Sequence, residues 1–337
     1  MALVKITEAD GRACLAGVPL ACPTDRQSLA VAPGVLRCPA GHEYPLVGGV
    51  AVLFNRDIPD THPYFEESRQ AGHGASEGRE PQAVAPGADE VDPFVQQEIV
   101  KTNGILYQGV LGGLRRYPIP DFPLPDTTAG LRLLDVGCNW GRWSIAASRR
   151  GYQAIGIDPG IAGIQAANRV AATLGQSPGF VVGDGRCLPF PDQTFDVVFS
   201  YSVLQHFSKE DAKVSIQEAA RVTKPGGRVL IQLANLFGVR QLYNEARDTL
   251  RGEQNPFRVR RWTPGEMLST FRALVGPARL TADGFFSLNA QASDLDLLRP
   301  FPRTVIRASE ALKSVSAHVP ALSLVADSVF IDASRAA

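Results

Sequence analysis

Short apolar runs that end in a small or acidic residue recur through the middle of the chain. They begin at residues 133, 154, 180 and 195, and a fifth strand is expected at 228–233. Runs of this length without polar alternation are typical of strands buried on both faces of a sheet. Capping boxes start helices at 208–211 and at 263–266, the second with Pro264 at the first helical position. Strands that alternate with helices predict an α/β fold built on a doubly wound sheet.

A glycine turn at 137–141 follows the first apolar run and precedes residues that open a helix. This arrangement points backbone N–H groups and the positive end of a helix at a bound ligand. The second run ends in Asp158, 23 residues after Asp135, where folds of this kind present a carboxylate to ribose hydroxyls. We therefore expect a ligand that contains a nucleoside.

Two further strands end in polar groups at the same predicted edge of the sheet. Asp184 and Gly185 follow the third strand, and Ser200 ends the fourth. The carboxyl ends of parallel strands form the ligand edge of open α/β sheets. A dinucleotide is disfavoured because the Gly-x-Gly-x-x-Gly spacing is absent: the chain has Asn139 and Arg142 where the second and third glycines would stand.

Together these elements resemble class I S-adenosylmethionine (SAM) dependent methyltransferases of the type 11 group, over roughly residues 130–235. The resemblance implies a Rossmann-like, seven-stranded methyltransferase sheet with helices on both faces, closed by an antiparallel pair near 279–288 and 325–332. It also implies SAM across the glycine turn, with Asp158 on the ribose and Asp184 and Gly185 beside the adenine. Asn139 replaces the middle glycine of the usual turn and tolerates left-handed backbone angles. The implied cofactor-binding residues are Asp135, Gly137, Cys138, Asn139, Trp140, Gly141, Asp158, Pro159, Asp184, Gly185 and Ser200.

The five cysteines are an odd number spread through a long chain, which disfavours a disulfide framework. Cys22, Asp25, Cys38 and His42 have the spacing Cys-x2-Asp-x12-Cys-x3-His, close to that of ribbons in which two turns each give two ligands to a tetrahedral metal. With the stretch that follows, they resemble the small zinc-ribbon domain found before some bacterial rRNA guanine methyltransferases. The resemblance implies a structural zinc. The alternatives are a ribbon without metal and Cys14 as the fourth ligand.

Composition divides the chain into three parts. Residues 1–60 form the predicted zinc-ribbon-like, β-rich domain, and residues 61–91, poor in large aliphatic side chains, predict a flexible linker. Residues 92–337 form the predicted methyltransferase domain, which begins with a helix capped at Asp92; in the resembling enzymes a helix here covers the cofactor. Long insertions at 237–262 and 289–320 fall at the ligand edge and predict the acceptor side.

His206 follows the fourth strand, where an acceptor would approach the methyl group. The ordinary histidine pKa of ~6.5 suits a general base for an oxygen or nitrogen nucleophile. The alternative is a histidine that caps or packs the following helix. Tyr107 and Tyr201 are further candidates, for which a role as pocket walls is the alternative. A basic cluster can hold an anionic acceptor or form a solvated charge run; its members are Arg258, Arg260 and Arg261.

Basic and acidic residues balance at 34 each, so net charge does not attract nucleic acid or an anionic membrane. No apolar run approaches the ~18 residues that span a bilayer, and the stretch 14–21 lacks the basic start of a signal peptide. We expect a cytoplasmic, SAM-dependent methyltransferase acting on an O or N nucleophile of a small-molecule, lipid or sugar acceptor. The alternatives are a non-catalytic, methyltransferase-like scaffold that recruits a partner and, disfavoured by the neutral charge, an RNA methyltransferase.

Overall fold

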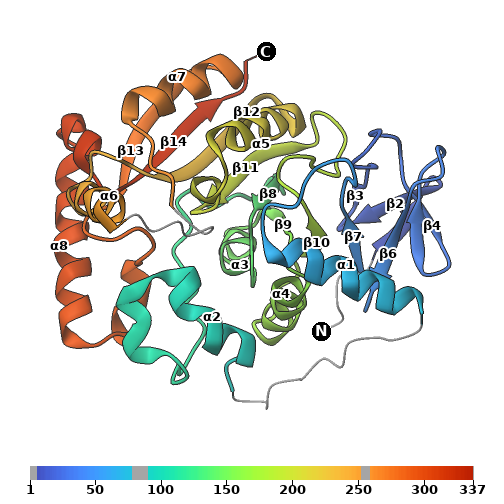
Figure 1. Ribbon diagram of the computed structural model, residues 1–337, viewed down its shortest axis with the longest axis horizontal. Helices are drawn as coiled ribbons and strands as arrows, with labels where there is room; N and C mark the ends of the chain where they lie inside the picture. Colours follow the sequence, from blue (N-terminus) through green and yellow to red (C-terminus); the bar gives the residue numbers. More distant parts are fainter. Residues whose placement is uncertain (1–5, 78–89, 252–258, 337) are drawn as a thin grey trace.

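The computed structural model describes residues 6–77, 90–251 and 259–336. Its main feature is a sheet of eleven strands in the order β13-β14-β12-β11-β8-β9-β10-β7-β6-β5-β4 (Figure 1). The mixed α/β class is therefore confirmed, but the expected count of seven strands is wrong for the sheet as a whole. Seven strands of the later part of the chain are contiguous, and four N-terminal strands extend them beyond β10.

The central strands are parallel, as the apolar runs predict. They pair in the order β10-β9-β8-β11-β12. The expected closing pair is also present, because β14 runs antiparallel to both β12 and β13. The bounds of these strands are β8 Arg132–Val136, β9 Gln153–Asp158, β10 Gly179–Gly183, β11 Phe195–Tyr201, β12 Thr223–Ala234, β13 Ala278–Gly284 and β14 Ser328–Ser334.

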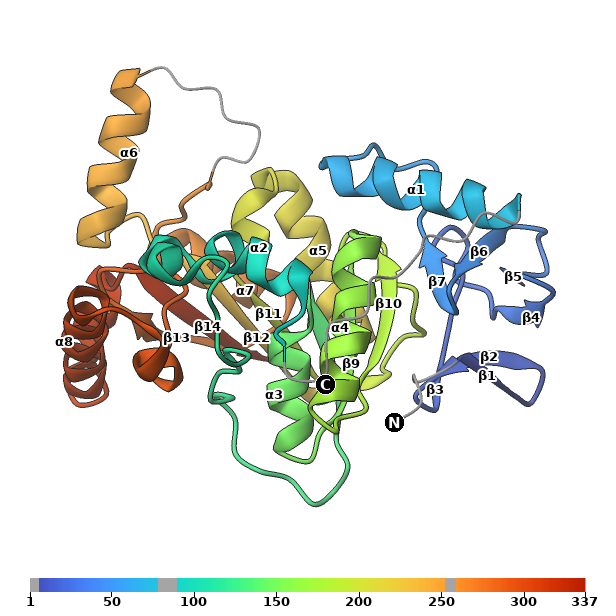
Figure 2. The same ribbon diagram turned by 90° about the horizontal axis from the view of Figure 1, so that it is seen from below.

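Helices cover both faces of this sheet. Helices α3 and α4 lie on one side, and α5 and α7 lie on the other (Figure 1). Helix α6 extends away from the sheet (Figure 2), and α8 packs against β13. The helix bounds are α2 Pro93–Asn103, α3 Arg142–Arg149, α4 Ile161–Thr173, α5 Lys209–Val222, α6 Val239–Arg251, α7 Pro264–Leu274 and α8 Pro300–Ser316, with short 3-10 helices η1 Ile105–Val110, η2 Leu204–His206, η3 Ala292–Leu297 and η4 Pro320–Val325.

Helix starts follow the capping signals in the sequence. The Asp92 side chain accepts a hydrogen bond from the Phe94 amide at the start of α2. Ser208 caps α5 in the same way, and Thr263 and Glu266 form a complete capping box at α7. These caps satisfy N–H groups that the helix itself leaves without acceptors. Within the described residues, no helix has the length and apolar character needed to cross a membrane.

The N-terminal region is β-rich, as expected, but it is not separate from the rest. Its last strand β7 pairs in parallel with β10, Val52 opposite Val182 and Leu53 opposite Gly183. A single hydrophobic cluster includes residues of both regions, such as Leu36 and Val181. The strands of this region are β1 Ile6–Ala9, β2 Arg12–Leu15, β3 Val18–Pro19, β4 Ala30–Ala32, β5 Val35–Arg37, β6 Glu43–Val47 and β7 Val50–Leu53.

The expectation of a flexible linker over 61–91 is wrong for its first half. Residues Pro63–Ser76 form helix α1, which packs on β6, α4 and β7 (Figure 1). Although the segment has few large aliphatic side chains, Phe65, Ser68 and Gly72 are buried on one face of the helix. The helix thus packs through small and aromatic residues, although the segment has few large aliphatic side chains. Residues 78–89 lie outside the described residues.

Candidate functional site

The glycine turn after β8 has the backbone that the sequence predicts. Gly137 and Gly141 have φ angles of +80° and +78°, and Asn139 has a φ of +47°. A Cβ on Gly137 would lie 2.2 Å from a methyl carbon of Val203, so only glycine fits there. Asparagine is among the few residues that adopt the left-handed region readily. Asn139 thus replaces a glycine without breaking the turn.

Asp158 stands at the end of β9 beside this turn. Its two carboxylate oxygens accept hydrogen bonds from the amides of Asn139 (3.0 Å) and Gly160 (2.9 Å). Burial raises the pKa of Asp158 to about 6, although these two hydrogen bonds act in the opposite direction. A carboxylate oxygen can accept more than one hydrogen bond, so each oxygen of Asp158 can accept a further hydrogen bond from a ligand hydroxyl.

Asp135 lies deeper, at the carboxyl end of β8. Its carboxylate accepts a hydrogen bond from the Ser144 hydroxyl (2.7 Å), which ties the strand to α3. Burial raises the pKa of Asp135 to about 7, whereas hydrogen bonds from Ser144 favour the ionised form. The Asp135 side chain therefore holds β8 and α3 together on either side of the glycine turn.

The third acid is engaged with a partner that the sequence did not suggest. Asp184 forms a buried ion pair with Arg186, with Nη2 to Oδ2 at 2.7 Å. Arg186 also donates to the carbonyl of Pro59 (2.8 Å), and therefore joins the end of β10 to the N-terminal region. An arginine two residues after a strand-ending acid was the available signal. A Cβ on the neighbouring Gly185 would lie 3.0 Å from a methyl carbon of Val136 and 3.1 Å from the Ser215 hydroxyl.

Three other predicted cofactor residues are packed into the protein. Trp140 is fully buried, and its indole N–H donates to the Thr102 hydroxyl of α2 (3.3 Å). The Ser200 hydroxyl donates to the carbonyl of Val136 (2.8 Å), which joins β11 to β8. Cys138 is buried, and burial raises the pKa of its thiol. These side chains hold the turn and the strand ends in place.

Helix α1 contacts the loop that follows Asp158, which the sequence did not predict. The buried Ser68 hydroxyl donates to the carbonyl of Pro159 (2.6 Å) and accepts from the amide of Ile161 (2.9 Å). Nearby, a Cβ on Gly160 would lie 3.4 Å from the Tyr64 ring. The N-terminal region therefore positions the backbone next to Asp158, the carboxylate expected to bind the ribose.

His206 lies at the end of η2, directly after β11, and is half-buried. Arg260 fixes this segment, because its guanidinium donates to the carbonyl of His206 (2.8 Å). Arg261 forms an ion pair with Glu245 and donates to Gln241 (2.9 Å). Both arginines thus make contacts within the protein. The third member of the expected basic cluster, Arg258, lies outside the described residues.

The helix α2 and the 3-10 helix η1 are anchored over the ligand edge by polar contacts. Asp92 forms a two-point ion pair with Arg169 of α4, with the shorter distance 2.7 Å. The hydroxyl of the fully buried Tyr107 donates to Asp294 (2.5 Å), in the insertion 289–320. The Tyr201 hydroxyl donates to Asp283 (2.7 Å). Both tyrosine hydroxyls are therefore engaged in hydrogen bonds to buried acids.

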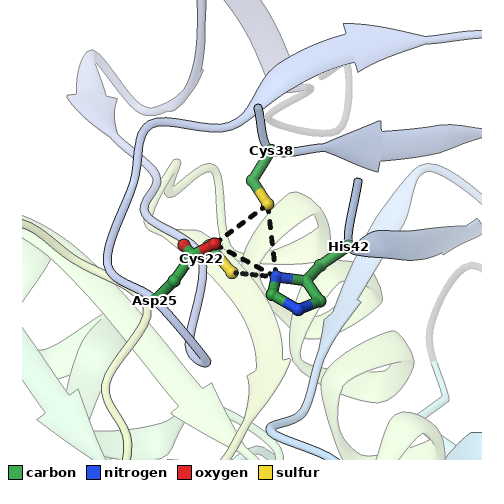
Figure 3. A group of neighbouring side chains, drawn as sticks. All are labelled: Cys22, Asp25, Cys38 and His42. Carbon is green, nitrogen blue, oxygen red and sulfur yellow. Dashed lines mark hydrogen bonds and ion pairs between the residues drawn. The ribbon is translucent and has the colours of Figure 1, made fainter. Parts of the chain in front are cut away.

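The four predicted metal ligands come together between the β-turns of the N-terminal region (Figure 3). Their ligand atoms all lie within 4.8 Å of one another. His42 Nδ1 is 3.1 Å from Asp25 Oδ2, 3.5 Å from Cys22 Sγ and 3.3 Å from Cys38 Sγ. Cys14 is not a member of this group, and its thiol contacts the carbonyl of Arg12 instead.

Residues 134–231 match the family model described as a methyltransferase domain. This match and the curated relatives support a class I SAM-dependent methyltransferase. The ubiquinone biosynthesis O-methyltransferase of Bradyrhizobium sp. (strain ORS 278) is 33% identical over 111 residues, which are 32% of this chain and 41% of that protein. The uncharacterized methyltransferase YcgJ of Bacillus subtilis is 34% identical over 101 residues, 30% of this chain and 39% of that protein. This chain thus spans about two fifths of the length of these curated relatives.

Two solved structures are also similar. The structure of Bacillus subtilis YcgJ has 21% identity and a TM-score of 0.41, covering 62% of this chain and 93% of that one. A SAM-dependent methyltransferase of Thermotoga maritima, described as a possible histamine N-methyltransferase, has 14% identity and a TM-score of 0.46, covering 72% and 98%.

The segment matched by the methyltransferase domain model contains the glycine turn, Asp158, Asp184 and His206. It leaves out helix α1, the four clustered metal-ligand candidates and the insertion 289–320. The match therefore does not extend to these parts of the chain.

Proposed function

We propose that the protein transfers a methyl group from SAM to an O or N nucleophile of a small-molecule, lipid or sugar acceptor. The observation that carries the proposal is the glycine turn with Asp158 beside it, at the carboxyl ends of β8 and β9. The free lone pairs of that carboxylate suit two vicinal ribose hydroxyls. The parallel order of the central strands, and the match of residues 134–231 to a methyltransferase domain, support the same conclusion.

The chain's own residues have two tasks in this reaction. Asp158 and the glycine turn hold the nucleoside, while the elements beside β11 orient the acceptor, because in-line displacement depends mainly on near-attack geometry. Held by the glycine turn and Asp158, SAM would supply an electrophilic methyl group and a neutral thioether as the leaving group. His206 accepts the proton that the acceptor hydroxyl or amine releases.

An oxygen acceptor is favoured by the relatives named ubiquinone biosynthesis O-methyltransferases. The shared segment ends before β13 and the insertion 289–320, which hold Asp283 and Asp294 at the acceptor side. The relatives' acceptor is therefore not carried over to this chain, for which an oxygen nucleophile is the favoured case of the proposed O or N nucleophiles.

We also propose that Cys22, Asp25, Cys38 and His42 hold a structural zinc ion. Two thiolates, an imidazole and a carboxylate are a donor set that tetrahedral zinc accepts. Their spacing in the structure fits such a group, since ligand atoms all lie within 4.8 Å of one another. Bound zinc would cross-link the two turns of the N-terminal region. Its role would be structural, because all four positions around the ion are occupied by protein ligands.

The methyltransferase proposal is tested by calorimetry with SAM and by transfer of radiolabelled methyl groups to a panel of phenols, catechols, sugars and amines. Binding of SAM with turnover of any member supports the enzyme and excludes the scaffold. Absence of SAM binding by correctly folded protein would contradict the proposal.

A further inference from the structure

Arg142 is an arginine in an unusual position. It is the first residue of α3, directly after the glycine turn, and its side chain is only 5% exposed. Its Nε and Nη2 atoms are buried and have no hydrogen-bond partner among the residues that the structure describes. A buried guanidinium is costly unless its N–H groups are paired. The protein therefore keeps a charged group in place that its own side chains do not satisfy.

Asp294 is near Arg142, but it does not complete the pair. The distance from Arg142 Nη2 to Asp294 Oδ2 is 3.7 Å, too long for a hydrogen bond. The same oxygen accepts the Tyr107 hydroxyl at 2.5 Å. The other oxygen of Asp294 lies 3.9 Å from Arg116, a second cation. The negative charge of Asp294 thus lowers the electrostatic cost of burying Arg142. The Nε–H and Nη2–H groups of Arg142 still lack a hydrogen-bond acceptor among the described residues.

Asp283, a second buried acid on this side of the site, already has partners of its own. The Asp283 carboxylate accepts from the hydroxyls of Tyr201 (2.7 Å) and Ser328 (2.6 Å). Further buried polar atoms nearby have no partner among the described residues, including Asn103 Nδ2 of α2 and Asn289 Oδ1 of the insertion. Asn289 is joined to α2 through the carbonyl of Thr102 (3.2 Å). Unpaired groups therefore gather from α2, α3 and the insertion.

The two unpaired atoms of Arg142 identify the chemistry of the missing partner. Nε–H and Nη2–H lie along one edge of the planar guanidinium and point in parallel. This edge matches the two oxygens of a carboxylate, which arginine binds through a pair of parallel hydrogen bonds. A neutral hydroxyl would satisfy one N–H and leave the other buried without a partner.

We propose that Arg142 is the binding group for a ligand carboxylate at this site, a conclusion that rests on the proposed methyltransferase function. The carboxylate can come from the amino-acid end of the methyl donor or from an acidic acceptor. The titratable groups that interact with Arg142 are Tyr107 of η1, Asp294 of η3, Tyr201 of β11 and Asp283 of β13, and Asp158 is not among them, so the nucleoside part of the donor is held independently of Arg142.

The experiment compares Arg142→Met, which keeps the length of the side chain, with Arg142→Lys, which keeps its charge but not its planar edge. Arg149→Met, at an exposed position of the same helix, is the matched control. Calorimetry measures the affinity of each protein for two donor analogues. S-adenosylhomocysteine has the carboxylate, whereas 5′-methylthioadenosine lacks the whole amino-acid end. A second titration measures 3,4-dihydroxybenzoate and catechol with protein already saturated with S-adenosylhomocysteine.

If the donor supplies the carboxylate, Arg142→Met lowers the affinity for S-adenosylhomocysteine by about 10- to 100-fold and leaves the affinity for 5′-methylthioadenosine unchanged. If the acceptor supplies it, both donors bind normally, and the preference of the wild-type protein for dihydroxybenzoate over catechol disappears in the variant. In either case Arg142→Lys is intermediate and Arg149→Met behaves like wild type.

The proposal is overturned if Arg142→Met changes neither S-adenosylhomocysteine affinity nor a preference for the carboxylate probe. Thermal melting of the ligand-free protein gives a second test, because a binding group that is unpaired in the free protein should not stabilise it. We expect the melting temperature of Arg142→Met to equal or exceed that of wild type. A large decrease would instead show a structural pair with Asp294. If wild type binds neither donor analogue, the methyltransferase function itself fails.

Discussion

The candidate site is bordered at one end by the N-terminal region and at the other by α2, α3 and the insertion 289–320, and these two ends differ in how completely their polar groups are satisfied. At the N-terminal end, Ser68 and Arg186 use their side chains to join α1 and the ribbon to the central strands. At the acceptor end, Arg142, Asn103 and Asn289 are buried with polar atoms that lack partners among the described residues. Buried polar groups in folded proteins are normally paired. We therefore interpret the first end as a structural support and, in line with the proposal for Arg142, the second as the side that a ligand completes.

The largest expected effect breaks the support at the N-terminal end. Cys38→Ser should release the metal and lower the melting temperature by ~10 °C or more, because a structural zinc contributes folding free energy. It should also weaken SAM binding, since β7 and α1 of this region contact β10 and the loop after Asp158. Elemental analysis, thermal melting and calorimetry measure the three effects.

This outcome differs from what a ribbon on a flexible linker would give, which is loss of metal with unchanged SAM affinity. Cys14→Ser is the matched control, because Cys14 is a buried cysteine of the same region outside the four-residue group. Metal loss without any change in SAM affinity would show that the two regions are energetically independent.

The second effect concerns the acceptor end. His206→Ala should lower turnover by ~10²-fold with little change in SAM affinity, and the wild-type rate should rise with pH through the histidine pKa, because the base acts only when deprotonated. Steady-state kinetics with any accepted substrate measures this. Near wild-type turnover in the folded variant would leave His206 a packing residue that Arg260 holds through its carbonyl.

The third effect concerns how the stability of the folded protein depends on pH. Asp135 and Asp158 have raised pKa values of about 7 and about 6, so the folded protein holds more protons than the unfolded chain between pH 4 and 7. Their contribution to the free energy of unfolding therefore falls as pH rises through this window. The slope is ~1.4 kcal/mol per pH unit for each extra proton that the folded protein holds. Asp135→Asn should flatten this part of the pH profile of thermal stability.

Asp57→Asn, at an exposed position of the N-terminal region, provides the control and should leave the profile unchanged. If the stability of Asp135→Asn and wild type changed equally with pH, burial would not raise the pKa of Asp135 in the folded protein.

The smallest effect tests the contact between α1 and the cofactor loop. Ser68→Ala removes two hydrogen bonds to the backbone after Asp158, each worth ~1 kcal/mol, and should weaken SAM by about 3- to 10-fold. Ser76→Ala on the same helix is the control, because among the described residues its hydroxyl donates to the carbonyl of Gly72, within α1 itself. Equal SAM affinity in both variants would limit α1 to a role in stability.

Much of the sheet could be predicted because its signals are local. Apolar runs that end in Asp135 and Asp158 place these carboxylates at one edge, since parallel strands share that edge. The spacing of Cys22, Asp25, Cys38 and His42 likewise predicts the group that the structure brings together.

Features that depend on distant pairing could not be predicted in the same way. No local pattern shows that β7 adds to β10, because the strands lie more than 120 residues apart. A serine in a polar segment gives no sign of the bond from Ser68 to Pro159. Arg142 looks like a solvated residue at a helix start, and only the structure shows that it is buried with Nε and Nη2 lacking hydrogen-bond partners among the described residues.

The most direct test of the account is a calorimetric titration of S-adenosylhomocysteine into wild type, Asp158→Ala and the exposed control Asp57→Ala. We predict binding by wild type and the control, and a loss of about 1.5 to 3 kcal/mol in Asp158→Ala, the value of hydrogen bonds to a charged acceptor, with near-UV circular dichroism unchanged. Equal affinity in folded Asp158→Ala and wild type would contradict the assignment of this carboxylate to the ribose.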